Sequence, residues 1–175
     1  MTKFLLSVHV LAAILAIGPI TVAASMFPRY VRPRAAEGDS PEGNGPEGEN
    51  ARTAALLHRV CRGYTVVGVA VPAFGVATGA QLGVLADAWL LASVMLTAAA
   101  AALLLLAILP GQQRLLARLT DGDTDSETAT GTGIGTVEAR RSAAARLAMI
   151  TGIFNLLWAV VVVLMIVRPG STTGA

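Results

Sequence analysis

Four long apolar stretches, separated by polar ones, dominate the pattern of residues along the chain. They span residues 4–27, 64–86, 89–109 and 147–167, and none of them contains Lys, Arg, Asp or Glu. A helix needs about 20 apolar residues to cross a hydrocarbon core of about 30 Å, because each residue adds about 1.5 Å. The pattern predicts an all-α, four-transmembrane-helix bundle of two antiparallel helical hairpins, with residues 1–175 forming a single integral membrane domain.

Two polar linkers separate the first span from the second and the third from the fourth. Residues 35–50 consist mainly of Gly, Pro and Glu, and residues 120–136 mainly of Thr, Gly and Asp. Neither linker has enough apolar residues to form a core, so we expect both to be disordered. Asn50 and Thr136, the last residues of the two linkers, are the predicted N-caps of the helices that follow.

Arginines are concentrated beside the two linkers. Six flank the first linker and five the second, whereas the other side of the spans carries only Lys3 and Arg168. Because cytoplasmic loops hold the excess of Lys and Arg, this distribution predicts cytoplasmic linkers, with the N and C termini outside the cell (cytoplasmic) membrane. The linker arginines are Arg29, Arg32, Arg34, Arg52, Arg59, Arg62, Arg114, Arg118, Arg140, Arg141 and Arg146.

Composition agrees with a membrane location. Hydrophobic residues make up 54% of the chain and charged residues only 14%, which is more apolar side chain than one soluble core can bury. The net charge of +2 does not indicate a nucleic-acid partner, because the cations lie next to apolar spans. Cys61 is the single cysteine, which excludes an intrachain disulfide and any Cys-x-x-Cys motif.

Three glycines, Gly75, Gly79 and Gly83, follow one another at intervals of four residues in the second span. Their spacing leaves one helix face without side chains, so another helix can approach it closely. The alternatives for this face are a ligand crevice and the interface of a homodimer. Pro19 and Pro72 each remove a backbone donor from the interior of a span, and we expect kinks there.

A few polar residues lie within the apolar spans. Four of them lie in the predicted outer half of their helices, where they could form an intramembrane polar cluster. They are His9, Gln81, Ser93 and Thr97. Asn155 lies deeper, on the same face of the fourth helix as Thr151. The alternative is that these groups make interhelical hydrogen bonds, worth about 0.6 kcal/mol each, that only hold the bundle together.

His9 is also the candidate ligand for a metal or haem. Met95 and Met165 lie in the outer half of their spans, and one imidazole with one thioether can ligate copper(I) or haem iron. Both methionines could equally be core packing residues. Since no acidic residue lies within a span, the sequence predicts no catalytic residues and no hydrolytic enzyme.

Two stretches resemble a known family. Residues 9–19 (HVLAAILAIGP) and 152–158 (GIFNLLW) look like an uncharacterised bacterial integral membrane protein family, domain of unknown function 2269. The first helix is more distantly similar to the copper-resistance D-like group, in which a histidine is followed by Trp and then Gly. Here Gly18 matches and Ala16 replaces the Trp. The resemblance implies a four-helix bundle in the cytoplasmic membrane and supports His9 as a site residue.

These observations favour a structural or accessory membrane subunit. A haem- or copper-handling protein using His9 and a small-solute carrier are the alternatives. The expected partners are the lipid bilayer and a second copy or a larger membrane complex, with no nucleic acid. The two halves, each an apolar span, a linker and another span, also fit a parallel 2+2 repeat, or two hairpins that converged on one pattern.

Overall fold

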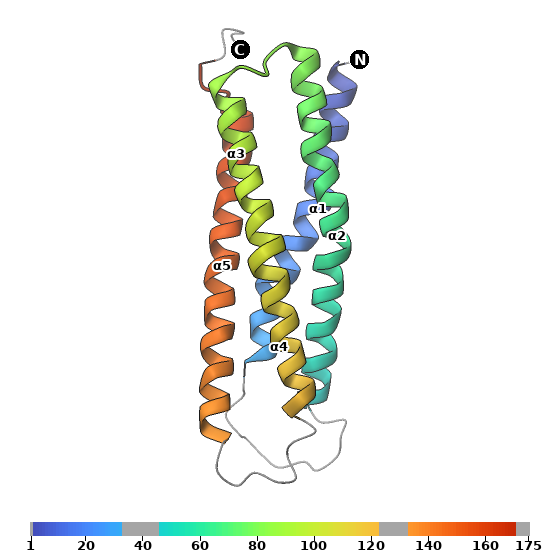
Figure 1. Ribbon diagram of the computed structural model, residues 1–175. Helices are drawn as coiled ribbons and strands as arrows, with labels where there is room; N and C mark the ends of the chain where they lie inside the picture. The colour runs from blue at the N-terminus through green and yellow to red at the C-terminus, as the bar shows by residue number, and fades with distance from the viewer. Residues whose placement is uncertain (1, 33–45, 123–132, 171–175) are drawn as a thin grey trace.

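Long helices make up nearly all of the described chain in the computed structural model, which covers residues 2–32, 46–122 and 133–170. Within these residues there is no strand, and one π-helix, η1, joins α3 to α4 so that the three form one continuous rod (Figure 1). The elements are α1 (Thr2–Val31), α2 (Pro46–Leu82), α3 (Ala88–Leu103), η1 (Leu104–Ile108), α4 (Leu109–Gly122) and α5 (Gly133–Val167).

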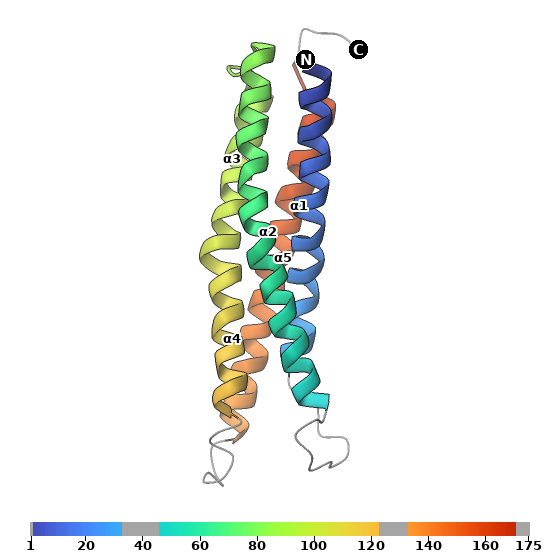
Figure 2. The same cartoon turned by 90° about the vertical axis from the view of Figure 1, so that its right-hand side faces the viewer.

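The helices form two antiparallel pairs, α1 with α2 and the α3–η1–α4 rod with α5 (Figures 1 and 2). One end of the bundle, here called the terminal end, contains Thr2, the α2–α3 turn and Val167. The other end, here called the linker end, contains Val31, Pro46, Gly122 and Gly133. The first residue of α1 and the last residue of α5 are therefore on the same side of the bundle.

Four helical segments are long and apolar enough to cross a membrane, judged by length and composition. They are Leu6–Val31, Gly48–Leu82, Ala88–Leu119 and Val137–Val167. The predicted all-α bundle of four transmembrane helices is confirmed, and the chain is a multi-pass membrane protein.

Two helices begin earlier than the linker boundaries predicted. α2 already starts at Pro46 and α5 at Gly133, so Asn50 and Thr136 lie inside helices and the N-cap prediction is wrong. Proline is favourable at the first helical position, since its missing N–H would have no partner there. An established helix also extends readily, because each added residue gains a hydrogen bond. Residues 35–45 and 123–132 of the predicted disordered linkers lie outside the described residues.

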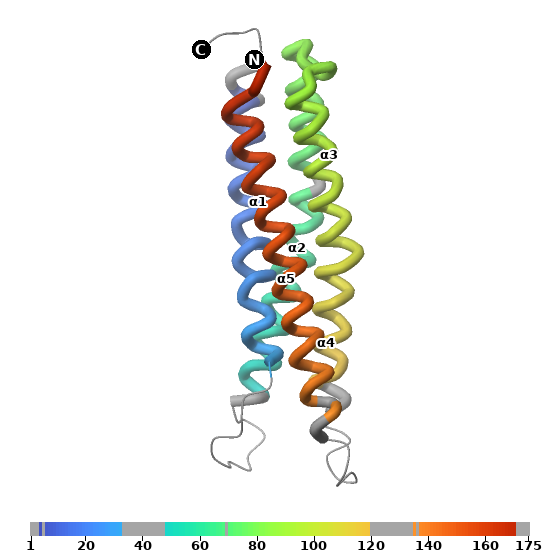
Figure 3. Tube along the Cα trace, turned by 90° about the vertical axis from the view of Figure 1, so that its left-hand side faces the viewer, coloured from blue at the N-terminus to red at the C-terminus, as the bar shows by residue number. Residues whose placement is uncertain are grey.

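The buried core is concentrated in the linker half of the bundle and continues to mid-height. Small residues, such as Ala23, Ala24 and Ala54, let the helices approach closely, and larger ones fill the space between them. Figure 3 shows α5 running beside α1, the helix with which it shares this core. The larger core residues are Ile20, Phe27, Val31, Leu104, Ile108, Leu115, Leu147 and Phe154.

The π-helix was not predicted from the sequence, and it precedes Pro110. A proline has no N–H and its ring clashes with the carbonyl four residues earlier, which here is that of Leu106. The wider turn is closed by a hydrogen bond from the Leu109 N–H to the Leu104 carbonyl, five residues back. The rod therefore passes Pro110 as a continuous helix, with one residue more in that turn than an α-helix would have.

At the terminal end, a small cluster around Trp89 ties the α2–α3 turn to α5. The Trp89 Nε1 donates a hydrogen bond to the Asp87 Oδ2 at 3.1 Å. The Arg168 guanidinium carbon lies 5.7 Å from the centre of the Trp89 ring, which permits a cation–π contact. Arg168 has a φ of 45°, so the chain leaves α5 in the left-handed conformation that commonly ends helices.

We expect Trp89→Phe to lower the free energy of unfolding by about 1 kcal/mol, because the hydrogen bond to Asp87 is lost. Thermal unfolding in detergent should show a midpoint lower by roughly 2–4 °C. Trp158→Phe is the matched control, since the Trp158 Nε1 is buried without a partner among the described residues. An equal drop in both variants would mean that ring size, and not the hydrogen bond, determines the loss.

Candidate functional site

A chain of buried polar side chains connects three helices in the linker half of the bundle. The His58 Nδ1 on α2 lies 2.9 Å from the Gln112 Oε1 on α4. The Gln112 Nε2 donates to the Cys61 Sγ at 3.7 Å, and the Cys61 thiol donates to the Ile20 carbonyl of α1 at 3.9 Å. Gln112 and Cys61 are fully buried, and His58 is 9% exposed.

The direction of this polar chain follows from its central amide. An amide oxygen only accepts hydrogen bonds, so the proton of the His58 ring lies on Nδ1. Each group then donates to the next, from His58 through Gln112 and Cys61 to the backbone of Ile20. In hydrocarbon, such a fully paired chain avoids the cost of an unsatisfied polar group while fixing how α1, α2 and α4 pack.

Sequence reasoning missed this polar chain. It treated Cys61 only as the single cysteine and did not consider Gln112, which follows the predicted third span of 89–109. The available signal was the spacing of His58 and Cys61, three residues apart and thus on one helix face. A sequence alone does not say that Gln112, 51 residues after Cys61, faces them.

His9 lies against the glycine face of α2. A Cβ atom placed on Gly75 would be only 2.8 Å from the His9 Cε1, so the ring fits there because the side chain is absent. The His9 Nδ1 is buried without a hydrogen-bond partner among the described residues. The close approach predicted at this face therefore occurs within the chain, between α1 and α2.

The other two glycines have different roles. A Cβ on Gly79 would be 2.9 Å from a methyl carbon of Leu90, so α3 packs closely at this position. Gly83 has a φ of +69° and lies in the turn that follows α2, a conformation that favours glycine. Gly75 and Gly79 are thus covered by the chain's own side chains, which leaves little of this face for a homodimer or a ligand crevice.

The polar residues predicted to cluster around His9 have separate surroundings. Ser93 is buried, and its hydroxyl donates to the Trp89 carbonyl of its own helix at 2.8 Å. Gln81 is exposed, and Thr97 is half-buried. Within the described part of the chain, no hydrogen bond joins any of them to His9, so the cluster and its role stay a prediction.

The two methionines predicted as ligands also differ in their surroundings. Met95 is 70% exposed, which places its thioether on the outer surface of the bundle, whereas His9 is half-buried between helices. Met165 on α5 is half-buried. In the described segments, no three His, Cys, Asp or Glu residues are grouped so that they could hold a metal ion. Copper or haem binding through His9 stays a prediction.

A second polar surface runs along α5. The Asn155 Nδ2 donates to the Ser25 Oγ of α1 at 3.1 Å, a contact that sequence reasoning did not predict. Three further atoms on this face are buried without a partner among the described residues: the Thr151 Oγ1, the Asn155 Oδ1 and the Trp158 Nε1. Because Thr151, Asn155 and Trp158 follow at intervals of four and three residues, these groups lie on one side of the helix.

No protein-family model, curated protein or solved structure matches the chain.

We expect Gln112→Leu to destabilise the protein by about 1–3 kcal/mol, because it leaves the buried His58 Nδ1–H without an acceptor. Gln113→Leu changes the exposed neighbouring residue and should alter the stability by less than about 0.5 kcal/mol. Adding His58→Phe to Gln112→Leu removes both partners and should recover part of the loss. Unfolding in detergent measures all three, and a Gln113→Leu effect as large as that of Gln112→Leu would contradict the polar chain.

Gly75→Ala tests the contact between α1 and α2. The added methyl group has to displace the His9 ring, and we expect a loss of about 1–3 kcal/mol in stability. Gly63→Ala is the control in the same helix, because a Cβ there meets nothing within 4 Å. His9→Ala combined with Gly75→Ala should restore stability relative to Gly75→Ala alone. If it does not, the His9 ring is not what occupies this space.

Proposed function

We propose that this protein is a small structural or accessory subunit of the cytoplasmic membrane, which assembles with another membrane helix through the outward face of α5. The observation that carries the proposal is a stripe of exposed residues along this helix. We call it the α5 seam; it consists of Ala145, Met149, Gly152, Leu156, Ala159 and Val163.

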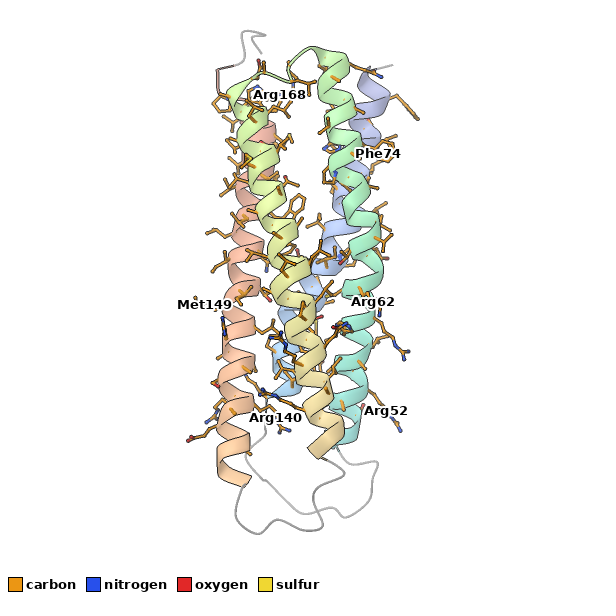
Figure 4. All side chains as sticks on the ribbon, viewed as in Figure 1. Arg52, Arg62, Phe74, Arg140, Met149 and Arg168 are labelled. Atoms are coloured by element: carbon orange, nitrogen blue, oxygen red, sulfur yellow. The ribbon has the colours of Figure 1, made fainter. Side chains whose placement is uncertain are left out.

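The spacing of the α5 seam is that of a helix–helix interface. Its members alternate at intervals of four and three residues, so they stay on one side of the helix over its length. Every seventh residue is small (Ala145, Gly152 and Ala159), which permits close approach of a second backbone in a membrane. The larger residues between them supply packing surface, and Figure 4 shows one of them, Met149, pointing away from the bundle.

Two further observations support α5 as the assembling helix. A Cβ on Gly152 would meet no other atom of the described chain within 4 Å, in contrast to Gly75 and Gly79. Among the four spans, α5 also has the smallest share of its apolar segment buried inside the bundle, 17% against 22–28% for the others. It is therefore the helix with most surface left for a partner.

The proposed orientation places the linker end in the cytoplasm and both termini outside, which the arginines beside the linkers support. Kinship with the domain of unknown function 2269 family is likewise a proposal, supported by residues 9–19 and 152–158. Haem or copper handling through His9 and small-solute transport stay the alternatives. The unpartnered polar atoms of α5 are the feature that a carrier would use.

Cross-linking of native membranes tests the assembly. In a Cys61→Ser background, we expect Gly152→Cys to give a discrete adduct of higher mass upon mild oxidation or with a short bifunctional thiol reagent. Mass spectrometry of the adduct then tells a second copy from a different membrane protein. The exposed Leu106 provides the control: it lies on η1, outside the α5 seam, and Leu106→Cys should give no such adduct. Equal cross-linking at both positions, or none at either, would contradict the proposal.

A further inference from the structure

A groove of about 580 Å³ lies between the η1–α4 part of the rod and α5, at the linker end of the bundle. We infer that this groove binds one anionic phospholipid, with three arginines holding the phosphate and the apolar part holding an acyl chain. This inference concerns a different face from the α5 seam and does not depend on the proposed assembly.

The charged part of the groove is complementary to a phosphate. Arg114 and Arg118 are four residues apart on α4, so both guanidinium groups extend from the same helix face, and Arg146 extends from α5 opposite. No acidic residue lines the groove, and none of the three arginines is paired with a carboxylate of the described chain. Guanidinium groups bind phosphate oxygens through paired hydrogen bonds, which makes such a cluster suited to a phosphate ester.

The apolar part of the groove lies further into the membrane. Leu106 and Ile150 line it there, and Leu106 is twelve residues, or about 18 Å, from Arg118 along the rod. Gly111 lets α4 come close to α5 at the floor of the groove, since a Cβ there would be 3.0 Å from a methyl carbon of Leu147. The groove is thus cationic towards its end and apolar towards the middle of the bundle, as a lipid molecule requires.

A lipid fits these features better than a free anion. A soluble phosphate would use only the arginines and leave the apolar part of the groove empty. The groove also lies within two of the candidate membrane spans, Ala88–Leu119 and Val137–Val167, so that its apolar part is at the level of the hydrocarbon. Basic pockets between transmembrane helices are a recurrent type of site for anionic lipid headgroups.

The test compares two triple variants that remove the same charge. The groove variant combines Arg114→Gln, Arg118→Gln and Arg146→Gln, which removes the three arginines of the groove. The control variant combines Arg29→Gln, Arg52→Gln and Arg62→Gln. It removes three exposed arginines in the linker half of the bundle that do not line the groove. Figure 4 shows Arg52 and Arg62 pointing away from the bundle. Circular dichroism and gel filtration confirm that both variants are folded before lipid is measured.

Each protein is reconstituted in phosphatidylcholine containing phosphatidylglycerol and is then purified in detergent, and the retained lipid is measured by native mass spectrometry. We expect one phosphatidylglycerol per chain in the wild type and in the control variant, and at least about tenfold less in the groove variant. Phosphatidylcholine should not be retained, and millimolar inorganic phosphate should not displace the bound lipid.

Three outcomes would overturn the inference. Equal loss of lipid in both triple variants would mean that overall charge attracts the lipid. No lipid retained by the wild type would mean that the groove is not a site, and displacement by inorganic phosphate would identify a site for a free anion. As a second variant, Ala143→Phe fills the groove without changing its charge, and it should also weaken lipid retention.

Discussion

A polar group in hydrocarbon has no water to bond with, and this constraint governs the structure at every level. It requires helices, because only they satisfy the backbone within each spanning segment. It also acts on single side chains: the hydroxyls of Thr65, Thr78 and Ser93 each donate to the carbonyl four residues earlier in their own helix. Where no such partner is in reach, as for Gln112, the bundle supplies one from another helix.

The sequence was sufficient to predict an all-α bundle with four spans, because solvation by lipid depends on composition over about 20 residues. It could also indicate the close approach at Gly75 and Gly79, since a missing side chain has the same effect whatever the partner. The partners themselves, His9 and Leu90, were not predictable. Which residues of different helices meet depends on how each helix is rotated, and an apolar pattern on all sides does not fix that rotation.

In the candidate site, too, the sequence could indicate some residues but not the contacts that they make. His9 could be singled out as an ionisable residue in a span, but the contact between the Asn155 amide and Ser25 and the chain from His58 to Cys61 needed three-dimensional positions. The bundle thus uses polar residues in two ways. His58, Gln112 and Cys61 are paired and buried with the main core, whereas Thr151, Asn155 and Trp158 of α5 each keep one buried polar atom without a partner among the described residues.

The wide turn Leu104–Ile108 changes more than the path past a proline. One additional residue in a turn rotates everything after it by about 100° relative to an uninterrupted α-helix. The rotation decides that Gln112 faces α2 while Arg114 and Arg118 face α5. Gain or loss of a single codon in this segment would therefore turn a different side of α4 toward α2 and α5 in one evolutionary step.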